Sequence, residues 1–157
     1  MKISAQEEYG LRCLVQLANL RPGESLTLPQ IAEREGISTA NAGKLMWLLN
    51  KAGFVHSTRG TKGGYFLARP ADEVRLNEVI KVLDQDVLNK HCESYTGVMD
   101  SCVHNGDCGI RPVIVGLHEI VENALSQITL AQLVGTESSV DAMFHQIKGI
   151  HRTLEAQ

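Results

Sequence analysis

The sequence predicts a mainly α-helical protein with one small β-hairpin. Apolar residues recur at helical spacing in several separate segments, and glycine, proline or a capping residue marks most of their ends. One pair of short segments of β-forming residues flanks a glycine-rich turn. At 157 residues, with 43% hydrophobic residues, the chain can bury a core without a disulfide framework.

Three helices are predicted in the first third of the chain. Leucine, valine and alanine repeat at helical spacing within residues 4–20, and Arg21-Pro22-Gly23 ends that helix. Thr27 is the predicted N-cap of a short second helix that stops at Gly36, and Ser38 is the N-cap of a third. Two helices joined by a tight glycine-containing turn form a helix-turn-helix.

A hairpin is predicted directly after these helices, with strands at residues 54–57 and 65–67. The segment Arg59-Gly60-Thr61-Lys62-Gly63-Gly64 places two cations among glycines at its tip. A helix-turn-helix followed by such a hairpin, or wing, is a winged helix. We therefore expect a winged helix-turn-helix domain at residues 1–70.

Three more helices are predicted in residues 71–157. One starts near Asp72, a long one begins at Pro112 with an apolar stripe that reaches Ile128, and a weaker amphipathic helix follows at residues 138–154. The long helix has more apolar surface than a small winged domain can cover. We expect it to be a dimerisation helix that packs against a second copy of the chain, within a second unit that also holds a cysteine-containing loop.

Charge is distributed unevenly along the chain. Residues 1–69 carry nine Lys or Arg and five Asp or Glu (net +4), whereas residues 70–157 carry six and thirteen (net −7). Such asymmetry hints at a nucleic-acid-binding half, although ordinary surface charge also produces it. The start of the chain lacks an apolar signal core and no apolar run is long enough to span a membrane, so we expect a cytoplasmic protein with no membrane partner. Hydrolase and phosphate-loop signatures are absent, and no enzyme is predicted.

The helix-turn-helix and wing are predicted to contact double-stranded DNA. A helix that enters the major groove needs exposed polar residues near its start, where its dipole also favours phosphates. A solvated helix surface explains the helix residues equally well, but a basic wing in this position favours DNA. The predicted DNA-contacting residues are Thr27, Ser38, Thr39, Asn41, Lys44, Arg59, Gly60, Thr61 and Lys62.

Three of the four cysteines lie in one polar stretch, residues 91–112, as Cys92, Cys102 and Cys108. Their spacing, C-x9-C-x5-C, lacks the close C-x2-4-C pair that is usual in structural zinc sites. Iron-sulfur clusters tolerate longer gaps in an open loop. Disulfides are disfavoured in the cytoplasm. The spacing favours a cluster and leaves zinc or redox-active thiols as alternatives.

Three thiolates leave one cluster ligand to be supplied by another residue. Cys13 lies on the inward stripe of the first helix, where a small buried hydrophobe is expected. Glu7 and Glu8 offer carboxylates, although the helix dipole alone favours acids in a first turn. His91 and His104 are local but are expected to be solvated. The residues by themselves leave this choice open.

Together these motifs resemble a known family, the iron-sulfur winged-helix transcription regulators of bacteria (IscR, NsrR and RirA type). The resemblance covers residues 1 to about 135. It rests on the three cysteines and on four sequence motifs: M-K-I-S with G-L-R-C-L-V-Q-L-A, N-K-A-G-F-V, R-G-T-K-G-G-Y-F-L-A-R-P and I-T-L-A-Q-L-V. It implies a homodimeric transcription regulator that binds a two-fold operator, with an affinity that depends on assembly, loss or oxidation of a cluster.

The resemblance also implies roles for individual residues. The three cysteines match the family's cluster ligands, and Arg59 matches a residue that enters the minor groove. Some relatives use a histidine three residues after the last cysteine, where this chain has Arg111. Others use an acidic residue early in the first helix of the opposite subunit, where this chain has Glu8. Glu8 is therefore the expected fourth ligand.

Two departures from the family pattern limit what it implies. The helix after Ser38 starts with small residues where relatives often carry aromatic or charged ones, so no operator sequence is implied. The long first cysteine gap leaves both 2Fe-2S and 4Fe-4S clusters open. We expect a regulator that senses iron, nitric oxide or redox state through its cluster. The alternative is a zinc-bound or cluster-free regulator whose thiols sense oxidants directly.

Overall fold

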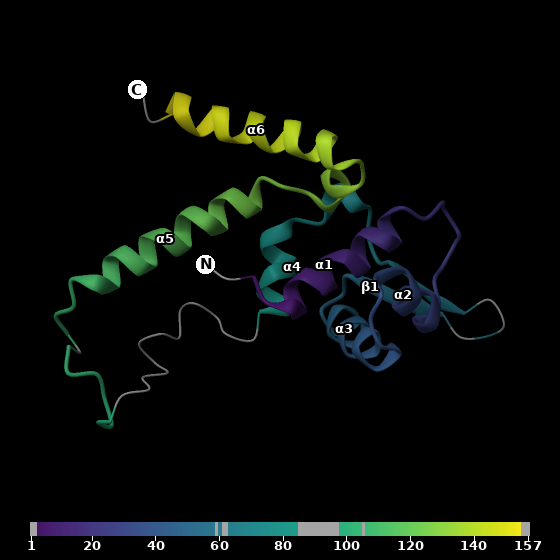
Figure 1. The fold of residues 1–157 in the computed structure, drawn as a ribbon, viewed down its shortest axis with the longest axis horizontal. Coiled ribbons are helices and arrows are strands. Elements are labelled where there is room, and N and C mark those ends of the chain that lie inside the picture. Colours follow the sequence, from purple (N-terminus) through teal and green to yellow (C-terminus); the bar gives the residue numbers. More distant parts are fainter. Residues whose placement is uncertain (1–2, 59, 61–62, 85–97, 105, 155–157) are drawn as a thin grey trace.

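The computed structural model describes residues 3–58, 60, 63–84, 98–104 and 106–154 (Figure 1). The elements in chain order are α1 (Ala5–Ala18), α2 (Leu28–Glu35), α3 (Thr39–Lys51), β1 (Val55–Thr58), β2 (Gly64–Leu67), the 3-10 turn η1 (Ala71–Glu73), α4 (Leu76–Leu83), α5 (Ile110–Ser126), the 3-10 turn η3 (Leu130–Leu133) and α6 (Glu137–Leu154). This mainly helical chain with one antiparallel hairpin confirms the predicted fold class.

Local sequence signals determine where the first three helices begin and end. Ser4 and Thr27 each accept a hydrogen bond from the backbone three residues on, and each completes a capping box. Ser38 accepts the N–H of Asn41 in the same way at the start of α3. Gly36 ends α2 with a left-handed φ of 64°. The predicted caps of α2 and α3 are therefore confirmed.

The core lies between α1, α3, α4 and the hairpin, and α1 packs closely against α4 at Gly10. A Cβ atom at Gly10 would lie 2.5 Å from Cδ1 of Leu83, a side chain with no exposed surface. The missing side chain lets the two helices pack. The largest fully buried side chains are Leu14, Ile31, Leu45, Met46, Leu49, Leu83, Leu130, Val55, Val74, Val79 and Cys13.

The two strands of the wing are paired with a third segment that the sequence did not predict. β1 and β2 are antiparallel, with Val55 opposite Leu67. Leu26, just before α2, exchanges both backbone hydrogen bonds with Tyr65 at 3.0 and 2.7 Å. A Cβ atom at Gly64 would lie 2.8 Å from the carbonyl oxygen of Leu26, so a glycine is required at this crossing. This bridge attaches the base of the wing to the helix-turn-helix.

The fourth helix starts later than predicted. Asp72 lies in the short turn η1, and α4 begins only at Leu76. The residues between them are extended because they pair with the chain after α5: the N–H of Leu130 donates to the carbonyl of Val74 at 2.8 Å, and the N–H of Leu76 donates to Ile128 at 3.0 Å. This long-range pairing overrides the helical pattern of the sequence. It also joins the end of α5 to the winged domain, and the predicted division at residue 70 stays a prediction.

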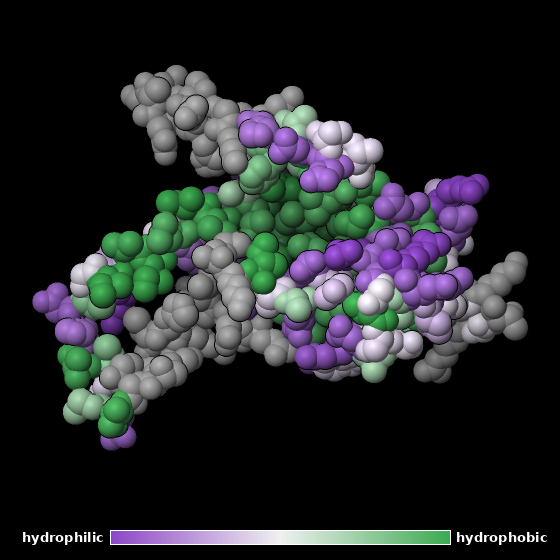
Figure 2. Space-filling view, viewed as in Figure 1, coloured by the Kyte–Doolittle hydropathy of each residue, from purple (hydrophilic) through white to green (hydrophobic). Residues whose placement is uncertain are grey.

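Helix α5 extends away from the winged domain and carries exposed apolar side chains (Figures 1 and 2). It begins at Ile110 rather than Pro112 and ends at Ser126, before the buried Ile128. None of its residues is buried, and its exposed apolar residues are Ile110, Val113, Ile114, Val115, Leu117 and Ile120. The excess of apolar surface predicted for this helix is confirmed. No helix in the described ranges is long and apolar enough to cross a membrane.

An ion pair between α4 and α5 helps to hold the base of the long helix in place. Lys81 of α4 contacts the carboxylate of Glu122 of α5, and His118 lies 3.6 Å from the same carboxylate. The hydrogen bond from Lys81 lowers the pKa of Glu122. Because Lys81 is largely exposed, this pair orients α5 more than it stabilises the fold.

Candidate DNA interface and cysteine segment

The exposed face of α3 displays the polar residues that were predicted to contact DNA. Thr39, Asn41 and Lys44 are exposed, whereas the opposite face of the helix is buried in the core. No Asp or Glu occurs between Thr39 and Lys51. The start of this helix therefore offers polar side chains, the Lys44 ammonium and the positive end of the helix dipole to a ligand.

Thr27 and Ser38 are exposed, but their hydroxyl groups already have structural partners. The Thr27 hydroxyl accepts the N–H of Gln30 at 3.4 Å, and the Ser38 hydroxyl accepts the N–H of Asn41 at 3.2 Å. Both residues therefore fix the starts of α2 and α3. Their contact with DNA is still a prediction.

The wing is described except at three residues of its tip. His56, Ser57 and Thr58 are exposed along β1, and Gly60 is exposed with a φ of 117°, which favours glycine. Arg59, Thr61 and Lys62 lie outside the described residues. Their predicted DNA contacts remain predictions.

Two of the three cysteines of the predicted cluster site are described. Cys102 and Cys108 are free, partly exposed thiols, and Cys92 lies outside the described residues. The carbonyl of Cys108 accepts the N–H of Arg111 at 3.3 Å, so this cysteine stands at the entrance to α5. In Figure 1 the described part of this segment lies at the end of α5 that is far from the winged domain.

The described part of the chain does not bring Glu8 to these cysteines. No group of three or more His, Cys, Asp and Glu side chains that could hold a metal ion occurs among the described residues. Glu8 lies on α1 in the winged domain, and its side chain is 56% exposed. His104 is exposed, and His91 lies outside the described residues.

Cys13 is buried in the core, as its position on the inward stripe of the first helix predicted. Its side chain has no exposed surface, and burial raises its pKa from an ordinary value of 9.0 to about 12. It is therefore a neutral thiol at physiological pH. Thiolates are the form that binds metals, so Cys13 is unsuited to be the fourth ligand.

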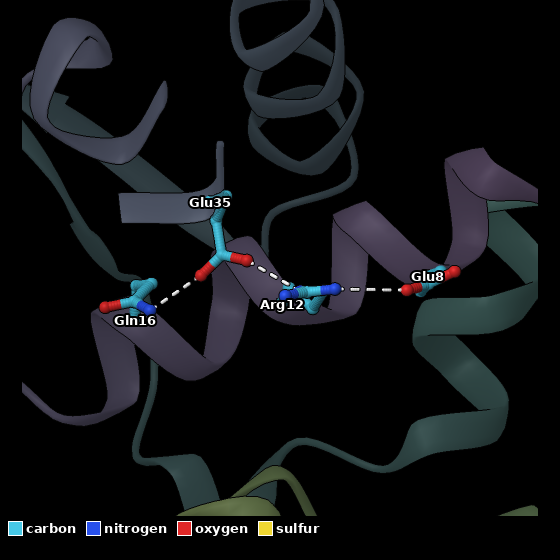
Figure 3. A network of polar contacts seen from close by, with 4 residues as sticks. All are labelled: Glu8, Arg12, Gln16 and Glu35. Carbon is cyan, nitrogen blue, oxygen red and sulfur yellow. Dashed lines mark hydrogen bonds and ion pairs between the residues drawn. The ribbon is translucent and has the colours of Figure 1, made fainter. Parts of the chain in front are cut away.

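Glu8 belongs to a polar network that joins α1 to α2 (Figure 3). Arg12 lies 3.1 Å from the Glu8 carboxylate and donates to Glu35 of α2 at 2.8 Å. Gln16 donates to the other oxygen of Glu35 at 2.6 Å. The hydrogen bonds that Arg12 donates to Glu35 and Glu8, chiefly the one to Glu35, raise the pKa of Arg12. The carboxylate of Glu35 is only 4% exposed, so Arg12 supplies the countercharge that it needs.

Sequence reasoning identified Glu8 but missed its partners. The i, i+4 spacing of Glu8, Arg12 and Gln16 along one helix was visible in the sequence. The position of Glu35 was not, because its contact with α1 depends on how α2 packs.

The chain combines a winged helix, whose exposed helix α3 carries lysines and no acidic residue, with a cysteine segment. Comparison with known proteins identifies its family. The model of the Rrf2 family, described as an iron-dependent transcriptional regulator, matches residues 3–136. The chain belongs to the Rrf2 family. Members of this family are transcription regulators, so the chain is a DNA-binding transcription regulator and not an enzyme.

Individual Rrf2 relatives agree with this assignment. The HTH-type transcriptional regulator IscR of Cronobacter sakazakii (strain ATCC BAA-894) is 29% identical over 157 residues, which cover 100% of this chain and 94% of that protein. IscR of Pectobacterium carotovorum subsp. carotovorum (strain PC1) is 29% identical over 153 residues, covering 98% and 91%. The predicted family is confirmed.

Solved structures share the Rrf2 fold. T. potens IscR is 30% identical with a TM-score of 0.66, over 85% of this chain and 86% of that one. CymR, the global cysteine regulator of B. subtilis, is 27% identical with a TM-score of 0.65, over 85% and 96%. The oxidized form of Staphylococcus aureus CymR is 26% identical with a TM-score of 0.68, over 87% and 98%.

Proposed function

We propose that this Rrf2 regulator is a homodimer that controls transcription in response to iron, nitric oxide or redox state, through an iron-sulfur cluster held by Cys92, Cys102 and Cys108. The observation that carries the proposal is that Cys102 and Cys108 are free, partly exposed thiols on a segment that leads directly into α5. Thiolates on an open segment are the usual ligands of such clusters. A bound cluster would be a redox-active centre, and its loss or oxidation would change the conformation of the regulator.

Glu8 is the proposed fourth ligand. It is the exposed acid of the first turn of α1, whereas Glu7 is buried in its capping box with Ser4. The described part of the cysteine segment is remote from α1 in one chain (Figure 1), so we propose that Glu8 is supplied by the partner subunit. A carboxylate binds iron more weakly than a thiolate does, which suits a ligand that must be released.

The homodimer is supported by the uncovered apolar face of α5. Isolated apolar side chains are normal on a protein surface, but this helix exposes six of them along one element. Covering such a face with the same face of a second copy is the symmetric solution that most dimers use. Pairing α5 with its copy would relate the two winged domains by a two-fold axis, which matches the symmetry of a palindromic operator.

The polar network offers a path from the fourth ligand to the helix-turn-helix. Glu8 shares Arg12 with the buried Glu35, which lies at the end of α2. If the Glu8 carboxylate turns away from Arg12 to bind the cluster, Arg12 keeps its hydrogen bond to Glu35, which also accepts a hydrogen bond from Gln16 of α1. The orientation of α1 against α2, and so the position of α3 on DNA, would then depend on the ligand state of Glu8.

Anaerobic purification followed by iron, sulfide and visible absorption analysis tests the cluster. We expect iron, sulfide and a visible chromophore in the wild type, loss of colour in Cys102→Ala and Cys108→Ala, and normal colour in the control Cys13→Ala. Glu8→Ala should change the spectrum or the rate of cluster loss without unfolding the protein. Normal colour in the two segment variants would exclude them as ligands.

The DNA contacts are proposed for the residues predicted from the sequence. Arg59→Ala should weaken operator binding by about 1–3 kcal/mol if the side chain enters a groove. Lys44→Ala should weaken binding to all duplexes and lower the salt dependence. Unchanged affinity in either variant would remove that residue from the interface.

A second candidate is a zinc-bound or cluster-free regulator whose thiols sense oxidants directly. It is favoured by the similarity to CymR, which is described as a global cysteine regulator and has been solved in an oxidized form. Colourless anaerobic protein with stoichiometric zinc, or with a disulfide that forms on mild oxidation, would support this candidate. Stoichiometric iron and sulfide would exclude it.

A further inference from the structure

We propose that Trp47 and Lys51, on the second half of α3, form a contact for the sugar-phosphate backbone of DNA at the rim of the major groove. This inference rests on the DNA-binding function and adds a contact separate from the base-facing residues at the start of α3. It predicts a sequence-independent contribution to affinity.

Trp47 is placed where the fold does not need it. Its side chain is 59% exposed, whereas the large apolar residues on the other face of α3, Leu45, Met46 and Leu49, are buried. A large exposed aromatic side chain commonly marks a binding surface, because its apolar ring and its N–H group can contact a partner together. The Lys51 ammonium lies 5.2 Å from the centre of the indole ring, which orients the ring and the cation as one unit.

The charge around Trp47 favours an anionic partner. Lys44 stands three residues before it and Lys51 four residues after it, so all three side chains share one face of the helix. Because α3 contains no acidic residue, this face presents two cations with an aromatic ring between them. DNA backbone, with its regular phosphates and apolar deoxyribose rings, matches both features.

Helix geometry places this pair at the backbone rather than at the bases. At 1.5 Å per residue, Trp47 lies about 12 Å along the axis from Thr39, while the major groove is only about 8.5 Å deep. If the start of α3 approaches the groove floor and the helix axis rises out of the groove from there, Trp47 reaches the level of the phosphates. Ala40 and Gly43 on the turns before Trp47 are small, and Lys44 on the same face is a flexible cation that can itself pair with a phosphate.

The contact we propose has three parts. The indole ring packs against deoxyribose, its Nε1–H donates to a phosphate oxygen, and Lys51 pairs with a neighbouring phosphate. The ring carries no charge, so it adds apolar contact and one hydrogen bond. Lys51 releases a counterion and therefore contributes to the salt dependence of binding.

The chain contains a single tryptophan, so its fluorescence reports on this position alone. Full-length protein is titrated with two probes: a duplex selected from a random library by the protein itself, and the unselected random-sequence duplex at low salt. We expect the emission of Trp47 to change with both probes. Trp47→Ala should lower affinity several-fold for both with the salt slope unchanged, Lys51→Ala should lower the salt slope by about 1, and Trp47→Phe should keep most of the affinity.

Three outcomes would overturn the inference. If Trp47→Ala weakens only the selected duplex, Trp47 contacts bases and the backbone assignment is wrong. If emission and affinity are unchanged while Lys44→Ala weakens binding, the exposed tryptophan serves another partner and DNA binding by α3 still holds. If the wild type binds neither duplex under any ligand state, the DNA-binding function fails with it. Trp47 and Lys51 are exposed, so the variants at these positions should have the thermal midpoint of the wild type, and this measurement is the control for folding.

Discussion

Replacing Gly10 by Ala tests whether α1 and α4 are held at the distance that the structure shows. The added Cβ would lie 2.5 Å from Cδ1 and 2.7 Å from Cδ2 of Leu83. Carbon atoms prefer separations of about 3.5–4.0 Å, so the shortfall is about 1 Å or more. Leu83 has no exposed surface into which it could swing, and α1 or α4 must therefore move.

Two effects of opposite sign determine how much Gly10→Ala changes the free energy of unfolding. Overpacking a dense core costs about 1–3 kcal/mol, and Ala in place of Gly in a helix gains up to about 1 kcal/mol. Gly43→Ala is the matched control, because its Cβ would meet only Leu28 Cδ1 at an ordinary 3.9 Å. We expect the control to be neutral or stabilising and Gly10→Ala to be less stable than the control by about 1–3 kcal/mol.

Urea unfolding followed by far-UV circular dichroism, at one protein concentration, measures this difference. With a slope of about 1–3 kcal/mol/M, a loss of 1.5 kcal/mol moves the midpoint by roughly 0.5–1.5 M. Leu83→Ala removes the obstructing methyl groups, so adding Gly10→Ala to it should be neutral or stabilising, with a coupling energy of about 1–3 kcal/mol. Strict additivity of the two substitutions, or equal stability of Gly10→Ala and Gly43→Ala, would refute the proposed packing.

Three further predictions concern the wing, the buried thiol and the polar network. Gly64→Ala should weaken DNA binding and lower the thermal midpoint, because its Cβ would lie 2.8 Å from the carbonyl oxygen of Leu26. The control Gly109→Ala, whose Cβ would have nothing within 4 Å, should leave the midpoint unchanged. Equal midpoints for the two variants would contradict the close contact between Gly64 and Leu26. Burial raises the pKa of Cys13 to about 12. The folded state is therefore favoured below pH 9 and loses stability as the pH rises from 9 towards 12, because the thiol ionises in the unfolded chain first. Cys13→Ala should flatten this part of the curve of unfolding free energy against pH, and a curve identical to that of the wild type would argue against the burial. Arg12→Ala should lower the thermal midpoint more than Glu8→Ala does, since it leaves the buried Glu35 carboxylate with an amide as its remaining partner, and the reverse order would contradict the network.

Local chemistry made the helix-turn-helix predictable. The caps at Thr27 and Ser38, the glycine stop at Gly36 and the strands of the wing depend on residues only a few positions apart, and each was found where the sequence predicted it to within a residue or two. The apolar excess of α5 was visible for a related reason, since helical periodicity records how much surface must be covered.

The tertiary structure decided what depends on contacts between distant parts of the chain. The start of α4 moved from Asp72 to Leu76 because the preceding residues pair with the segment after α5, some 50 positions along the chain. The partnership of Arg12 with Glu35, the close approach at Gly10 and the exposure of Trp47 likewise follow from packing.

The sequence by itself thus determined the helix caps of the helix-turn-helix, the hairpin and the family resemblance, while the ligand of the cysteine segment stays a prediction. The tertiary structure decided which polar groups meet, which glycines are obligatory and which side of α3 is free. The physical reason is range: caps, turns and periodicity are encoded within one or two helical turns, whereas burial and long-range hydrogen bonds exist only once the whole domain has packed.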